Sequence, residues 1–161
     1  MDDRALVAQQ LGRPPRAYRR VVVRCPFGRP AVTEQAPVDA DGAPFPTTYY
    51  LTCRQLVAAL SRLEAAGGVE RWSEAARAQP ELAASLDQAT AEQRRVRRAL
   101  AEGWEHPSLD AGIGGSSRPG SLKCLHAHAA FALARPGYEL GECILAEVEP
   151  LWPQRCCSDS D

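Results

Sequence analysis

The first half of the chain alternates short β-rich runs with turn residues. The run "YRRVVVRC" (18–25) has a β-branched centre and predicts a strand. After the turn "PFGRP", the run "AVTEQAP" (31–37) predicts a strand that returns beside the first. The aromatic run "TTYYLT" (47–52) predicts one more short strand. These runs together indicate a β-hairpin plus one strand.

In most of the remaining chain, apolar residues recur at helical spacing. Pro80 suits the first turn of the longest helix, and Ser121 suits the N-cap of the last core helix. The predicted helices span residues 2–11, 53–66, 69–79, 80–102 and 122–135, and "LGECILAEVEPLW" adds a short final element. The segment 105–120 between the last two long helices is expected to be loop.

Strands come first and helices follow, which is the order of an α+β fold. We therefore predict a small antiparallel β-sheet, made of a hairpin plus one strand, packed with several helices. A single domain is expected over 1–150, with the N-terminal helix 2–11 included. Residues 151–161 are expected to be a flexible C-terminal tail in which Cys156 and Cys157 are exposed.

Composition narrows the class of protein. The chain has 161 residues, of which 45% are hydrophobic and 24% charged, and its net charge is −1. These values are typical of a globular protein and give no strong nucleic-acid signal. The arginines of "EQRRVRRAL", which include Arg97, are expected to form a solvated helix face.

Location follows from what the sequence lacks. No run approaches the roughly 18 apolar residues of a membrane span, and the N-terminal residues do not resemble a secretory signal. We therefore expect a cytoplasmic protein. Its six cysteines are then expected to act as thiols, ligands or packing residues, because structural disulfides are rare in that compartment.

Candidate chemistry is concentrated in "GIGGSSRPGSLKCLHAH" (112–128), where a glycine-serine loop precedes Cys124, His126 and His128. A thiol in the first turn of a helix is favoured as thiolate by the helix dipole. On an ideal helix Cys124 and His128 share a face, whereas His126 lies about 200° away from Cys124. His126 can join Cys124 only if the first turn is irregular, so both histidines stay candidates.

Two further cysteines sit at predicted element ends, where side chains from distant segments can converge. Cys25 ends the first strand and Cys53 lies at a strand-to-helix junction. Thiolate and imidazole ligands in tetrahedral geometry are typical of zinc. A metal site from Cys25, Cys53, Cys124 and His128 or His126 is therefore one hypothesis, with structural zinc favoured and iron or an iron–sulfur cluster next.

Other functions stay open. Cys124 could serve as the nucleophile of a thiol-dependent enzyme with a neighbouring histidine as base. Arg24 and Lys123 are candidate anion contacts. Buried cysteine can also be a small packing residue, which would leave a metal-free interaction module with an exposed apolar patch.

The motifs "RCPFGRPAVTEQAP", "PFPTTYYLTC" and "KCLHAH" resemble those of an uncharacterised bacterial family, the domain of unknown function 501. The resemblance covers about residues 5–150 and implies no established activity. It implies that the family's motif cysteines and histidine fall at Cys25, Cys124 and His126. It also implies that Cys53 stands where the family accepts a histidine, a replacement that suits a metal ligand. Neighbouring genes in the family imply a protein partner linked to cell division or phosphate metabolism.

Overall fold

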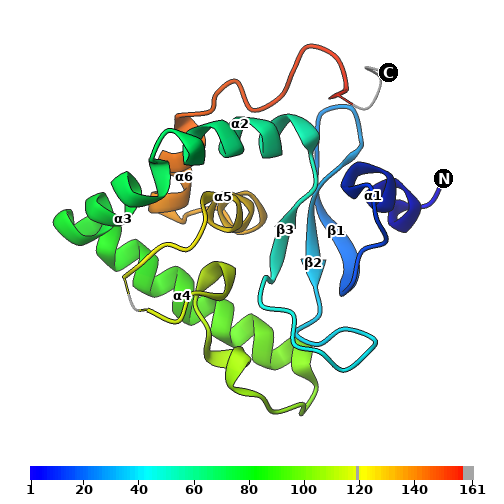
Figure 1. Ribbon diagram of the computed structural model, residues 1–161, viewed down its shortest axis with the longest axis horizontal. Coiled ribbons are helices and arrows are strands. Elements are labelled where there is room, and N and C mark those ends of the chain that lie inside the picture. The colour runs from blue at the N-terminus through cyan, green and yellow to red at the C-terminus, as the bar shows by residue number, and fades with distance from the viewer. Residues whose placement is uncertain (119, 158–161) are drawn as a thin grey trace.

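The computed structural model describes residues 1–118 and 120–157, and its centre is a three-stranded antiparallel sheet (Figure 1). The strands are β1 (Tyr18–Arg24), β2 (Pro30–Gln35) and β3 (Tyr49–Leu51), in the order β1-β2-β3. The hairpin and the additional strand predicted from the sequence are confirmed. All six residues of β2 are buried, as expected for the strand that is paired on both sides.

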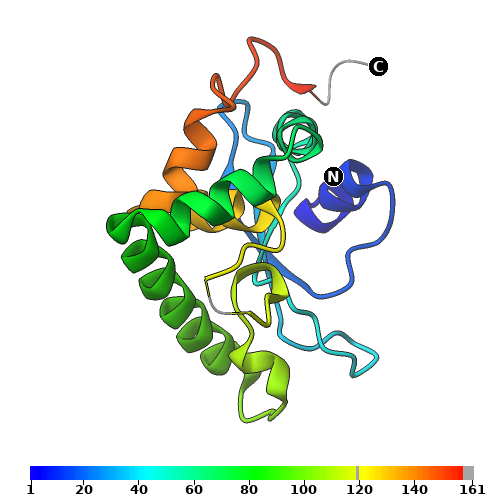
Figure 2. The ribbon, with the colours of Figure 1, turned by 60° about the vertical axis from the view of Figure 1, so that its left-hand side comes forward.

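Helices surround this sheet (Figures 1 and 2). They are α1 (Asp3–Leu11), α2 (Arg54–Ala65), α3 (Gly68–Ala78), α4 (Pro80–Ala101), α5 (Leu125–Ala134) and α6 (Glu139–Ala146). The segment expected to be loop contains two short 3-10 turns, Pro107–Asp110 and Ile113–Gly115. The α+β class is confirmed. Among the described residues, no helix is both long enough and apolar enough to cross a membrane.

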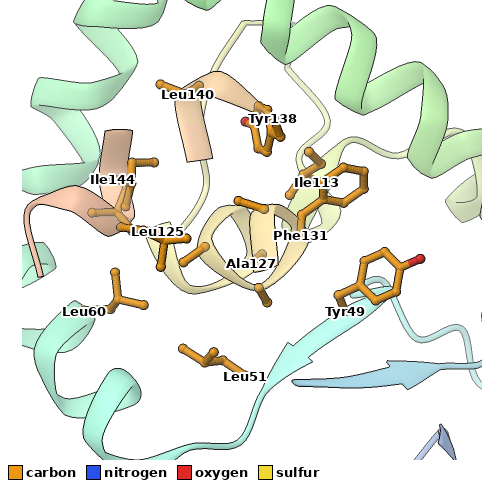
Figure 3. Close-up of a cluster of buried hydrophobic side chains, with 14 of the residues drawn as sticks. Tyr49, Leu51, Leu60, Ile113, Leu125, Ala127, Phe131, Tyr138, Leu140 and Ile144 are labelled. Atoms are coloured by element: carbon orange, nitrogen blue, oxygen red, sulfur yellow. The ribbon is translucent and has the colours of Figure 1, made fainter. Parts of the chain in front are cut away.

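The most enclosed helix is α5, which lies between the sheet and the helices α2 and α6 (Figure 3). The ring of Phe131 is 1% exposed and packs edge-on against Tyr49 of β3 and Tyr138 beside α6, with centroid distances of 5.6 Å to each. Gly141 of α6 lies so close that a Cβ there would be 2.7 Å from the Cβ of Ala132. Small side chains therefore allow α5 and α6 to pack closely.

The start of α5 differs from the prediction. The helix was expected from residue 122 with Ser121 as its cap, but it begins at Leu125, and Cys124 occupies the N-cap position. The reason is tertiary: the backbone N–H of Leu122 donates to Ser73 Oγ of α3 at 3.3 Å. The N–H of Leu125 donates to Glu64 Oε2 of α2 at 2.7 Å, so a carboxylate from another helix caps α5.

Arg97 also differs from the prediction, because its side chain is fully buried and does not belong to a solvated face. Its guanidinium donates to the backbone carbonyls of Phe45 (3.0 Å) and Ser108 (3.3 Å), and it lies 3.5 Å from Thr48 Oγ1. Burial lowers the pKa of this guanidinium. Arg97 thus joins α4 to the loop at Phe45 and to the 3-10 turn Pro107–Asp110.

The C-terminal segment returns to the body of the protein. Cys156 is only 4% exposed, and Cys157 packs against the hydrophobic core. The expectation of exposed thiols there is therefore wrong for Cys156. The flexibility of residues 151–161 stays a prediction, and residues 158–161 lie outside the described part of the chain.

The buried Arg97 gives a stability prediction. Replacing Arg97 by Met leaves the part-buried carbonyls of Phe45 and Ser108 without this donor, and we expect the free energy of unfolding to fall by about 2 kcal/mol. Urea denaturation measures this change. The control is Arg95→Met on the exposed face of the same helix, expected within about 0.5 kcal/mol of the original protein. An Arg97→Met variant at least as stable as the original would mean that desolvation of the charge outweighs its hydrogen bonds.

Candidate functional site

The structure distributes the predicted site residues over several places. Cys124 and His126 line one pocket. His128 is buried in the core, 1% exposed. Cys53 is buried at the start of α2 and lies beside Cys157. Cys25 lies half-buried in the turn after β1, where its N–H donates to the carbonyl of Arg29 at 2.9 Å.

His126 is held by α2 on both sides of its ring. Its Nδ1 lies 3.1 Å from Glu64 Oε1, and its Nε2 lies 3.2 Å from both Ser61 Oγ and the carbonyl oxygen of Val57. A proton on Nδ1 donates to the carboxylate and leaves Nε2 to accept from the Ser61 hydroxyl. When both nitrogens are protonated, the ring donates to Glu64 and to the Val57 carbonyl. Either form keeps the imidazole oriented.

Glu64 is therefore a shared anchor that the sequence analysis did not identify. Its Oε1 faces the imidazole of His126, and its Oε2 accepts from the N–H of Leu125. One carboxylate thus caps α5 and orients a histidine one residue further along. Glu64 is 61 residues from Leu125 in the chain, and no local pattern around it signals this role.

The Cys124 thiol is less acidic than its position suggests. Burial raises its pKa, and the charge of Glu64 acts in the same direction. The backbone N–H groups of Ala127 and His126 and the charge of Lys123 lower the pKa, but by less. The expected helix-dipole effect is present, and burial outweighs it. Cys124 is therefore a neutral thiol at neutral pH.

A pocket of about 500 Å³ joins these groups to the sheet. It lies between α1, β3, α2 and the first turn of α5. Cys124 and His126 are among its polar groups, together with Gln10, Thr52 and Arg54. Most of its wall is apolar or aromatic, formed by Leu11, Tyr49, Tyr50, Leu51, Val57, Ala58 and Ala127. Two motifs, "PFPTTYYLTC" and "KCLHAH", which are far apart in the chain, thus meet at one cavity.

His128 has a different environment. Its Nδ1 lies 2.7 Å from the hydroxyl of Tyr138, and its Nε2 is buried without a partner among the described residues. Burial lowers the pKa of His128 to about 3, so the ring is neutral at physiological pH. Burial also raises the pKa of the Tyr138 hydroxyl. Of the two candidate histidines, His126 is the one that lines a pocket with Cys124.

The described residues do not bring the predicted metal ligands together. Within 1–118 and 120–157, no group of three or more His, Cys, Asp or Glu side chains could hold a metal ion. Cys124 and His126 share the pocket, while Cys25, Cys53 and His128 lie elsewhere. Zinc, iron or an iron–sulfur cluster therefore stays a prediction, which the metal content of anaerobically purified protein tests.

The candidate anion contacts also lie apart. Arg24 forms an ion pair with Asp3 of α1 at 2.7 Å and donates to the carbonyl of Gly28 at 3.2 Å. Arg24 thus fastens α1 to the end of β1. Lys123, the other candidate, is exposed just before α5.

These features define a small α+β protein in which a thiol and a carboxylate-bound imidazole share one pocket. The family model described as "Protein of unknown function (DUF501)" matches residues 21–146, and the chain belongs to this family. The resemblance seen in the sequence motifs is confirmed. No curated protein and no solved structure matches the chain.

The buried Cys124 thiol gives a pH prediction. Because its folded-state pKa is raised, the thiolate fraction is small at neutral pH and increases only in alkali. We expect the alkylation rate of Cys124 by iodoacetamide, followed by peptide mass spectrometry, to be still rising above pH 9.0, the ordinary pKa of a thiol. A rate that reaches its plateau below that pH would contradict the assignment of a neutral, desolvated thiol.

Proposed function

We propose that the protein binds a small molecule in the pocket between α1, β3, α2 and α5. The observation that carries this proposal is a cavity of about 500 Å³ whose wall is mostly apolar and whose few polar groups converge from separate motifs. Pockets of this size and composition are typical of small-molecule sites. Cys124 and His126 are the reactive groups within reach of such a ligand.

Two lining residues indicate the polar chemistry of the ligand. Gln10 uses its Nε2 to donate to the carbonyl of Pro30 at 2.8 Å, which leaves its Oε1 buried without a partner among the described residues. Thr52 Oγ1 is likewise buried and unpartnered. Unpaired buried polar atoms are costly, and a ligand N–H or O–H that reaches them after a small side-chain rotation offsets that cost.

The remaining features of the pocket favour an apolar ligand with an acidic end. Tyr49, Tyr50 and Leu51 supply an aromatic and aliphatic wall. Arg54 is exposed at the edge of the pocket, where its guanidinium also donates to the carbonyl of Gln9 at 3.3 Å. We therefore propose a ligand with a flat apolar body, a hydrogen-bond donor and an anionic group that approaches Arg54.

Thiol-dependent chemistry is a second candidate, favoured by one observation. His126 is oriented by Glu64 at 3.1 Å, and it lines the same pocket as Cys124. A base that a third group orients is the usual arrangement beside a catalytic nucleophile. Because the Cys124 thiol is neutral and both ring nitrogens of His126 contact α2, His126 would have to give up its Nε2 contact with Ser61 to accept the thiol proton when a substrate binds.

A metal-free interaction module has less support. Its expected sign is an exposed apolar patch. Among the described residues, the exposed large hydrophobic side chains are Met1 and Phe27. A protein partner linked to cell division or phosphate metabolism stays a prediction from the family resemblance.

Blocking the pocket tests the main proposal. The probe is anilinonaphthalene sulfonate, a fluorescent dye with an apolar body, one N–H and an anionic group. Ala58 is exposed on α2 and lines the pocket, so Ala58→Trp fills the entrance without disturbing the core. We expect the dye to bind the original protein and its Kd to rise at least about tenfold in the variant, a loss of about 1.4 kcal/mol.

The matched control is Ala65→Trp, which adds the same side chain to an exposed position of α2 outside the pocket lining. The control variant is expected to bind the dye like the original protein. Equal Kd values for all three proteins, or no dye binding to the original protein, would count against a ligand site at this pocket.

A further inference from the structure

Cys53 and Cys157 meet in the structure although 103 residues separate them in the chain. Cys53 is the N-cap residue of α2 and is 3% exposed. Its thiol lies beside the side chain of Cys157, which packs against the core cluster that contains Cys53. Both cysteines are free thiols, and Cys157 is the more exposed of the two. Neither belongs to the Cys124 pocket.

The C-terminal segment brings Cys157 to this place. After α6 the chain runs alongside α2 toward the end at which that helix begins (Figures 1 and 2). Leu151, Trp152 and Cys157 pack against the hydrophobic core that contains Cys53. Side chains thus hold the segment over α2, and a covalent bond at its end would fasten it there.

We propose that Cys53 and Cys157 form a reversible disulfide that fastens the C-terminal segment to the start of α2. The oxidant is hydrogen peroxide, a small molecule that can reach the half-exposed Cys157. In the first step, the Cys157 thiolate attacks one peroxide oxygen, and hydroxide leaves to give a sulfenic acid. In the second step, the Cys53 sulfur attacks the Cys157 sulfur, and the departing hydroxide takes the Cys53 proton as water. Two thiols and one peroxide thus give one disulfide and two waters.

The environments of the two thiols agree with this order. Burial raises the pKa of Cys53 to about 11, so at neutral pH Cys53 stays a thiol and reacts slowly with peroxide on its own. Cys157 is accessible to the oxidant, and Cys53 is already in contact with it. The more exposed sulfur therefore reacts first, and the buried sulfur completes the bond.

The experiment treats the intact protein with a small excess of hydrogen peroxide and maps the cross-link by mass spectrometry without reduction. We expect the mass to fall by about 2 Da, the two hydrogens lost on disulfide formation, and one peptide pair to join Cys53 to Cys157. Dithiothreitol is expected to reverse the change. The Cys157→Ser variant is expected to lose the mass change, because the first-attacked sulfur is absent.

The matched control is Cys143→Ser, which removes another half-buried thiol, on α6, and is expected to oxidise like the original protein. The neighbouring Cys156 is the alternative disulfide partner that this experiment must distinguish from Cys53 and Cys157. A cross-link between Cys156 and Cys157, a cross-link of Cys156 to Cys53, or an oxidised protein in which Cys53 is still free to be alkylated after unfolding would overturn the proposal.

Discussion

The structure depends on the enclosure of α5 on every side. Seven of its ten residues are buried, and they include apolar side chains all round the helix, so the helix must be covered from all directions. The sheet, α2 and α6 supply that cover (Figure 3). Close approach requires small residues: a Cβ at Gly141 would lie 2.8 Å from the carbonyl oxygen of His128. The position of α5 therefore fixes the positions of its neighbours.

The site follows from how this buried helix begins. An enclosed N-terminus has unpaired N–H groups, and Glu64 of α2 satisfies one of them at Leu125. The same carboxylate holds His126. Because the helix starts at Leu125, Cys124 stays at the N-cap and faces the pocket with His126, whereas His128 points into the core. The start of α5 at Leu125 thus determines that His126 lines the pocket and that His128 lies in the core.

Much of the fold could be predicted from local patterns, and the site could be predicted only in part. The β-branched runs and the helical spacing identify the hairpin and the long helices, because those signals lie within one element. The start of α5 could not be predicted, since its cap comes from a distant helix and competes with the nearer Ser121. The burial of Arg97 and the meeting of Cys53 with Cys157 depend likewise on long-range contacts. The motifs identified Cys124 and His126, but only the fold shows the pocket that they share.

The buried helix α5 places His126 at the pocket and His128 in the core. Nitrogen-15 NMR of the histidine side chains across a pH titration tests the placement of His128 in the core. Because burial lowers the pKa of His128 to about 3, we expect a neutral ring whose signals stay unchanged from pH 8 down to about pH 5. A His128 ring that titrates near the ordinary pKa of 6.5 in the folded protein would contradict this placement.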